Sequence, residues 1–72
     1  MLEDAGVNHI RLRGTNPQLA QLLPNLYALV PRCSTFGSFL DETLRYLTSM
    51  RLSIMTMEYN ASTREVTLLV RG

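Results

Sequence analysis

The sequence predicts an α+β domain in which helices pack on one face of a small, mainly antiparallel three-stranded sheet with a C-terminal β-hairpin. Apolar and polar residues alternate near both ends of the chain, which is typical of strands with one buried face. Apolar residues at helical spacing fill the region between them. The 72 residues favour a single domain, residues 1–72, with a thin core.

The first strand is predicted over residues 7–13. Ile10 and Leu12 alternate there with charged or polar neighbours, so one face of the strand is expected to be wet. Residues 1–6 carry no comparable pattern, and we expect them to be disordered.

The first helix is predicted to begin near Asn16, because an Asn side chain can cap free N–H groups and Pro17 fits a first helical turn. Pro24 lacks an N–H and is expected to kink or split this helix, and Pro31 is expected to end it. Apolar residues recur through the segment at helical spacing: Leu19, Leu22, Leu23, Leu26, Leu29 and Val30.

A second helix is predicted from another apolar stripe at helical spacing. Ser38 is expected to cap its start, with Asp41 three residues later completing a pair that resembles a capping box. The stripe consists of Phe36, Phe39, Leu40, Thr43, Leu44 and Leu47.

A β-hairpin is predicted over the last third of the chain. Residues 51–59 and 65–71 are rich in strand-forming residues, and the polar residues 60–63 between them favour a turn.

Strict alternation along the first hairpin strand assigns Leu52 and Ile54 to the face that packs on the helices. Three residues then fall on the opposite face with Leu69, where they predict a second apolar cluster: Met55, Met57 and Tyr59.

The composition gives little support to catalysis or ligand chemistry. One cysteine and one histidine rule out an intrachain disulfide and a His/Cys metal cluster. Cys33 and His9 form the only possible thiol–imidazole pair, and a whole predicted helix separates them. We therefore predict no enzyme activity and no catalytic, cofactor-binding or metal-binding residues. The net charge of +1 argues against nucleic-acid binding.

Charge and hydropathy also bear on the membrane. No apolar run approaches the roughly 18 residues that a transmembrane helix requires. The first residues are acidic where a signal peptide would be basic. The low charged fraction of 18% suggests instead that some apolar surface stays exposed for contact with another protein.

Residues 16–72 resemble a known family. From Phe39 the chain runs FLDETLRYLTSMRLSIMTMEYNASTREVTLLVRG, an amphipathic helix followed by a strand, a polar turn and a strand ending in Val-Arg-Gly. This is similar to the periplasmic C-terminal domain of the type II secretion assembly-platform protein L and to the type IV pilus protein PilN. Upstream, NPQLAQL resembles the helical segment that precedes this unit in protein L. The family fold continues with a further helix and strand beyond the point that matches Gly72.

The resemblance implies a ferredoxin-like or truncated ferredoxin-like fold and a non-enzymatic scaffold without a cofactor. It implies a homodimer, a related platform subunit similar to protein M (for PilN, PilO) as partner, or both. It also implies a periplasmic segment of an inner-membrane protein of a secretion or pilus assembly platform; without it, a cytoplasmic location is expected.

Two functions stay open at this stage. One is a dimerising interaction module that forms part of a longer protein. The other is a complete small regulatory or inhibitor protein, such as a phage encodes, that binds a protein target. Seven residues are the interface candidates, with burial in the core as the competing interpretation: Met55, Met57, Tyr59, Leu69, Leu22, Leu26 and Tyr27.

Overall fold

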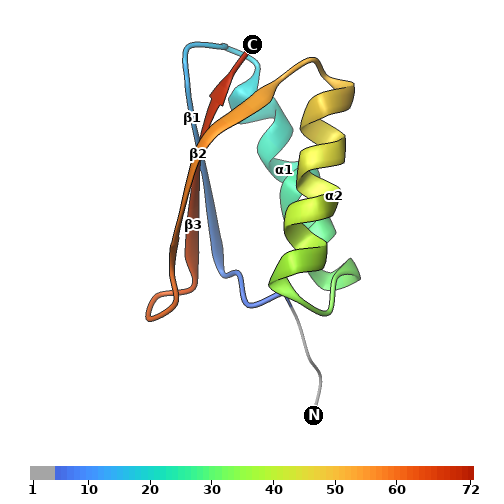
Figure 1. The fold of residues 1–72 in the computed structure, drawn as a ribbon, viewed down its shortest axis with the longest axis vertical. Helices are drawn as coiled ribbons and strands as arrows, with labels where there is room; N and C mark the ends of the chain where they lie inside the picture. Colours follow the sequence, from blue (N-terminus) through green and yellow to red (C-terminus); the bar gives the residue numbers. More distant parts are fainter. Residues whose placement is uncertain (1–4) are drawn as a thin grey trace.

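The computed structural model describes residues 5–72 and confirms the small α+β fold. Two helices lie on one side of a three-stranded sheet, and within residues 5–72 no helix covers the opposite side (Figure 1). Along the chain the elements are β1 (His9–Arg13), α1 (Leu19–Leu29), a 3₁₀ turn η1 (Val30–Arg32), α2 (Phe36–Ser49), β2 (Ser53–Asn60) and β3 (Glu65–Arg71).

The strand order in space is β1-β3-β2, so β1 and β2 form the two edges. The sheet is mixed: β2 and β3 form the predicted antiparallel hairpin, and β1 runs parallel to β3. Helix α1 packs on β1 and α2 packs on β2. Each edge strand therefore has its own helix beside it.

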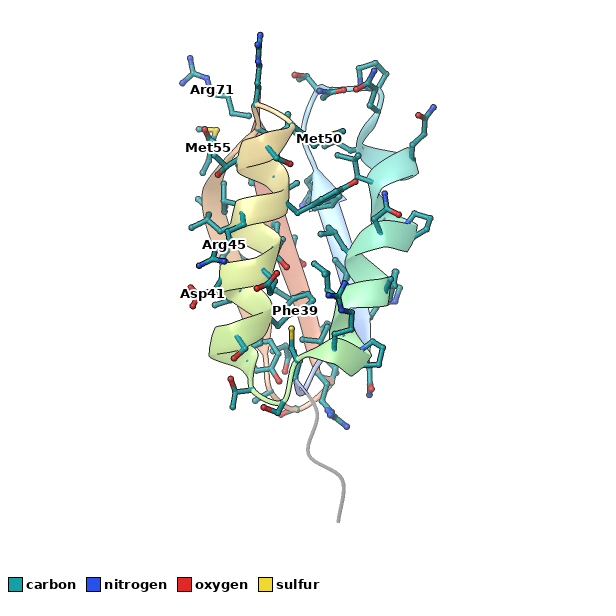
Figure 2. The ribbon with its side chains drawn as sticks, turned by 90° about the vertical axis from the view of Figure 1, so that its right-hand side faces the viewer. Phe39, Asp41, Arg45, Met50, Met55 and Arg71 are labelled. Atoms are coloured by element: carbon teal, nitrogen blue, oxygen red, sulfur yellow. The ribbon has the colours of Figure 1, made fainter. Side chains whose placement is uncertain are left out.

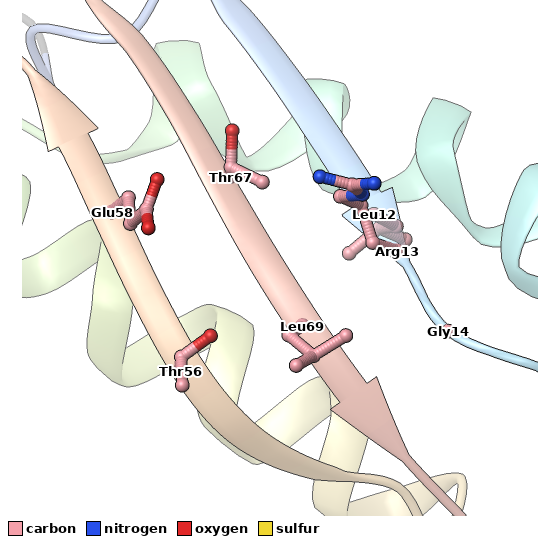
Figure 3. Close-up of a pocket in the computed structure, with 7 residues that line it drawn as sticks. All are labelled: Leu12, Arg13, Gly14, Thr56, Glu58, Thr67 and Leu69. Atoms are coloured by element: carbon pink, nitrogen blue, oxygen red, sulfur yellow. The ribbon is translucent and has the colours of Figure 1, made fainter.

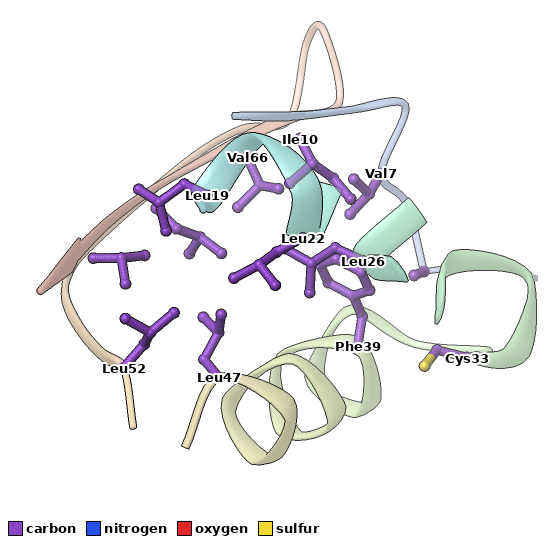
Figure 4. Packing of buried hydrophobic residues seen from close by; sticks show 13 residues of the cluster. Val7, Ile10, Leu19, Leu22, Leu26, Cys33, Phe39, Leu47, Leu52 and Val66 are labelled. Atoms are coloured by element: carbon purple, nitrogen blue, oxygen red, sulfur yellow. The ribbon is translucent and has the colours of Figure 1, made fainter. Parts of the chain in front are cut away.

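The core lies between the helices and the sheet (Figure 4). Phe39, Leu26 and Leu47 are fully buried there, beneath Val66 and Leu68 of the central strand. Fully burying a side chain of this size contributes roughly 1.5–3 kcal/mol, so these residues are a large part of the drive to fold.

The predicted start of each helix is displaced. Helix α1 begins at Leu19 rather than at Asn16, whose Oδ1 instead accepts a hydrogen bond from the Gln18 amide at 2.8 Å in the turn before the helix. Helix α2 is capped by Thr35, not by Ser38, because the Thr35 Oγ1 accepts the Ser38 amide at 3.1 Å.

Pro24 does not split α1, which is a single helix through Leu29. A proline here removes the hydrogen bond to the carbonyl of Ala20, and its ring crowds that carbonyl. Both residues are exposed, so water can satisfy that carbonyl at little cost. The helix ends before Pro31, as predicted.

The expectation of disorder in residues 1–6 is wrong for its last two residues, and residues 1–4 lie outside the part that the structure describes. Ala5 is buried in the core. The carbonyl of Gly6 accepts a hydrogen bond from the Tyr59 hydroxyl, which ties this segment to the end of β2.

Candidate functional site

The face assignment along β2 is right for Leu52 and Ile54, which pack toward the helices, but it is wrong for Met57 and Tyr59 because a β-bulge interrupts the strand after Ile54. Ile54 pairs with Val70, but the next pair is Thr56 with Leu69, so Met55 is an extra residue. An inserted residue reverses the alternation of every side chain after it. Met57 and Tyr59 consequently pair with the buried Leu68 and Val66 and share the helix-covered face with them.

The open face of the sheet is polar, and the predicted second apolar cluster is absent from it within residues 5–72. A shallow depression there is lined by Leu12, Arg13, Gly14, Thr56, Glu58, Thr67 and Leu69 (Figure 3). Leu69 pairs with Arg13 on one side and Thr56 on the other, and not with methionines. On the same face the Arg11 guanidinium pairs with the Glu65 carboxylate at 3.1 Å.

The outer edge of β1 is closed by a side chain from α1. The Ile10 amide donates to the Tyr27 hydroxyl at 2.9 Å, and that hydroxyl lies 3.3 Å from the Ile10 carbonyl, to which it can donate. The ring of His9 lies beside the same tyrosine, with centroids 6.5 Å apart. Another strand can pair with β1 here only by displacing Tyr27, so this edge is protected against association.

The outer edge of β2 is open. β3 is the one strand that pairs with β2 among residues 5–72, so the backbone groups on its other side have no strand partner. Met55 points out from this edge (Figure 2) and is 54% exposed. Open edges of this kind are natural sites for pairing with another chain.

An apolar groove of about 310 Å³ runs beside this open edge, between α2 and β2. Leu44 and Met57, which line it, are 50% and 40% exposed. The remaining lining residues are Leu40, Asp41 and Ile54. We call the groove, the outer edge of β2 and the adjoining Arg45 the α2–β2 flank.

The flank carries one acidic and one basic side chain. Asp41 and Arg45 both point out from the side of the molecule on which Met55 lies (Figure 2). They are four residues apart on α2, one helical turn, yet neither forms an ion pair within the described residues. Both charges are available to a partner.

The predicted interface residues thus have different surroundings. Met55 and Met57 lie at the flank. Tyr59 packs on Phe36 with ring centroids 4.3 Å apart. Leu22 and Leu26 belong to the core, at 5% and 0% exposed, and present no surface, so they are wrong as interface candidates.

Leu44 was missed as a surface residue. It lies at the margin of the apolar stripe of α2, where the sequence assigned it to the core. Its exposure indicates that α2 buries a narrower face, made of Phe39, Thr43 and Leu47.

The two candidate reactive groups lie in different places. His9 is exposed on β1, and Cys33 is buried in the connector after η1. Within residues 5–72, no three His, Cys, Asp or Glu side chains gather closely enough to hold a metal ion. Neither helix in this part of the chain is long and apolar enough to cross a membrane.

Comparison with protein-family models, curated proteins and solved structures finds no match to the chain. The resemblance to the secretion-platform protein therefore rests on the sequence pattern alone.

Proposed function

We propose that the chain is a non-enzymatic protein-interaction module, and specifically a dimerising scaffold part of a bacterial secretion or pilus assembly platform. The difference between the two sheet edges supports the interaction role most directly. Tyr27 closes the β1 edge, whereas the β2 edge lies open beside exposed Leu44 and Met57.

The flank offers both kinds of contact that such modules use. A partner strand or loop along the outer edge of β2 can form hydrogen bonds with the free backbone groups of β2, which fixes how the two strands align. An apolar side chain of the partner in the groove then adds affinity. Covering the exposed half of Leu44 and of Met57 contributes about 1 kcal/mol each. Contacts of this size suit a reversible association, as expected for a scaffold.

The sequence resemblance supplies the more specific part of the proposal. By that resemblance the partner is a second copy, a platform subunit similar to protein M, or both. The location is then periplasmic, in an inner-membrane protein.

The experiment is sedimentation equilibrium over a wide concentration range, combined with binding to the periplasmic domain of a protein M. Leu44→Asp places a charge in the groove at an exposed position, so the variant should fold and lose association. Ala20→Asp adds the same charge to an exposed site on α1 and should behave as wild type. The proposal fails if the wild type neither self-associates nor binds, or if Leu44→Asp has no effect on either interaction.

A further inference from the structure

We infer that the α2–β2 flank is occupied by a second copy of this chain, with α2 antiparallel to its symmetry mate and Asp41 of each copy facing Arg45 of the other. This rests on the proposed function and adds the geometry of the contact and the residues that select the partner.

The stripe along the outer side of α2 fits such a pairing. Asp41, Leu44, Arg45 and Thr48 are all exposed and recur at positions i, i+3, i+4 and i+7, so they share one side of the helix. Apolar Leu44 therefore lies between charged and polar residues on the side of α2 that would contact the second copy.

A two-fold symmetric contact must be complementary to itself, because the same patch supplies both sides. One negative and one positive charge on a single helix meet this condition. Asp41 and Arg45 are separated by about 6 Å along the helix axis, at ~1.5 Å per residue. A two-fold axis perpendicular to α2 and midway between these two residues, level with Thr43, relates two antiparallel helices. Asp41 of each copy then faces Arg45 of the other, which gives two identical ion pairs.

The same symmetry also suits β2. An axis at this height passes near the groove formed with Ile54 and Met57, so the two outer edges of β2 approach in antiparallel directions. Glu58 projects to the open face of the sheet, where it lies beside Thr67. Because Glu58 follows the groove residues, each copy's Glu58 lies away from the axis, and like charges do not meet. A partner surface with only acidic or only basic groups would instead face one like charge on α2, at Asp41 or at Arg45.

The test uses charge reversal and mixing, measured by sedimentation equilibrium, with circular dichroism to show that each variant is folded. Asp41→Arg alone places two arginines opposite each other at both pairs, and Arg45→Asp alone places two aspartates there. We expect each variant to weaken self-association by roughly 10- to 100-fold. An equimolar mixture restores both attractive pairs and should form a heterodimer about as tight as the wild-type dimer.

The mixture distinguishes ion pairs between two copies from an interaction of Asp41 with Arg45 inside one helix. Mixing cannot repair the loss of an interaction inside one helix, because each variant still carries two like charges on its own α2. Recovery of association in the mixture therefore reports contacts between copies. Glu42→Arg is the matched control: it makes the same charge change at the next residue of α2, which points about 100° away. That variant should dimerise as wild type.

Failure of this inference is distinguishable from failure of the proposed function. If Leu44→Asp abolishes dimerisation but the charge variants and their mixture do not differ from wild type, the flank remains the interface and this antiparallel geometry is wrong. If the wild type is monomeric at every concentration, a second copy is excluded. The proposed function then depends on binding to the other platform subunit.

Discussion

Replacing Thr43 with valine should stabilise the protein. Thr43 is fully buried in α2 between Phe39 and Leu47, and its hydroxyl has no hydrogen-bond partner within residues 5–72. Valine has nearly the same shape and is also β-branched, so the substitution removes the unsatisfied hydroxyl while keeping the volume and nearly the same helix propensity.

The size of the effect follows from the cost of burying that group. A buried hydroxyl without a partner costs roughly 1–3 kcal/mol in protein mutational data. The new methyl group also packs into an apolar core. We therefore expect Thr43→Val to raise the free energy of unfolding by about 1–2 kcal/mol and Tm by roughly 5–15 °C for a domain of this size.

The assay is urea and thermal unfolding at one fixed protein concentration, because self-association makes Tm depend on concentration. Thr15→Val is the control, since it makes the same chemical change at an exposed loop position away from the α2–β2 flank. Equal stability of Thr43→Val and wild type would refute the reasoning. It would mean that the hydroxyl is satisfied in solution, for instance by the Phe39 carbonyl one turn earlier.

Two further predictions concern the sheet edge and the end of α2. Tyr27→Phe removes the hydroxyl that covers the edge of β1; we expect a loss of about 1 kcal/mol and faster hydrogen exchange at the Ile10 amide, and unchanged exchange there would contradict the role of Tyr27. Arg51→Gly should raise the free energy of unfolding, measured in urea, by about 0.5–1 kcal/mol. Arg51 has φ +62°, and a residue other than glycine costs about 1–2 kcal/mol in this left-handed conformation. The greater chain entropy of glycine in the unfolded state offsets part of that gain. The amides of Arg51 and Leu52 bond back to the Thr48 and Leu47 carbonyls, each at 2.9 Å, in the pattern that normally places glycine at this position, so a less stable Arg51→Gly would argue against strain.

The candidate surface could be predicted only in part. Met55 and Met57 were identified by strict alternation along the strand, which placed them on the open face of the sheet; both are exposed, but Met57 lies on the helix-covered face. The signal that would have corrected the face assignment is also in the sequence: Met57 and Tyr59 alternate with the polar Thr56, Glu58 and Asn60. That polar set belongs on the open face, which requires a break in alternation between Ile54 and Thr56.

The sequence by itself determined the order of the elements, the C-terminal hairpin and the central part of the inward side of α2. These features depend on local spacing: a period of two residues for strands, 3.6 for helices, and turn residues between them. Phe39 and Leu47 were identified as core residues for this reason.

Only the tertiary structure decided which strand edges are free and which faces the residues of β2 occupy. Placing β3 in the centre makes β1 and β2 the edges, and this depends on pairing between segments far apart in the chain. The closure of one edge by Tyr27, whose sequence separation from Ile10 is 17, depends on the same packing. No local period encodes such contacts, because they form only after the helices dock on the sheet.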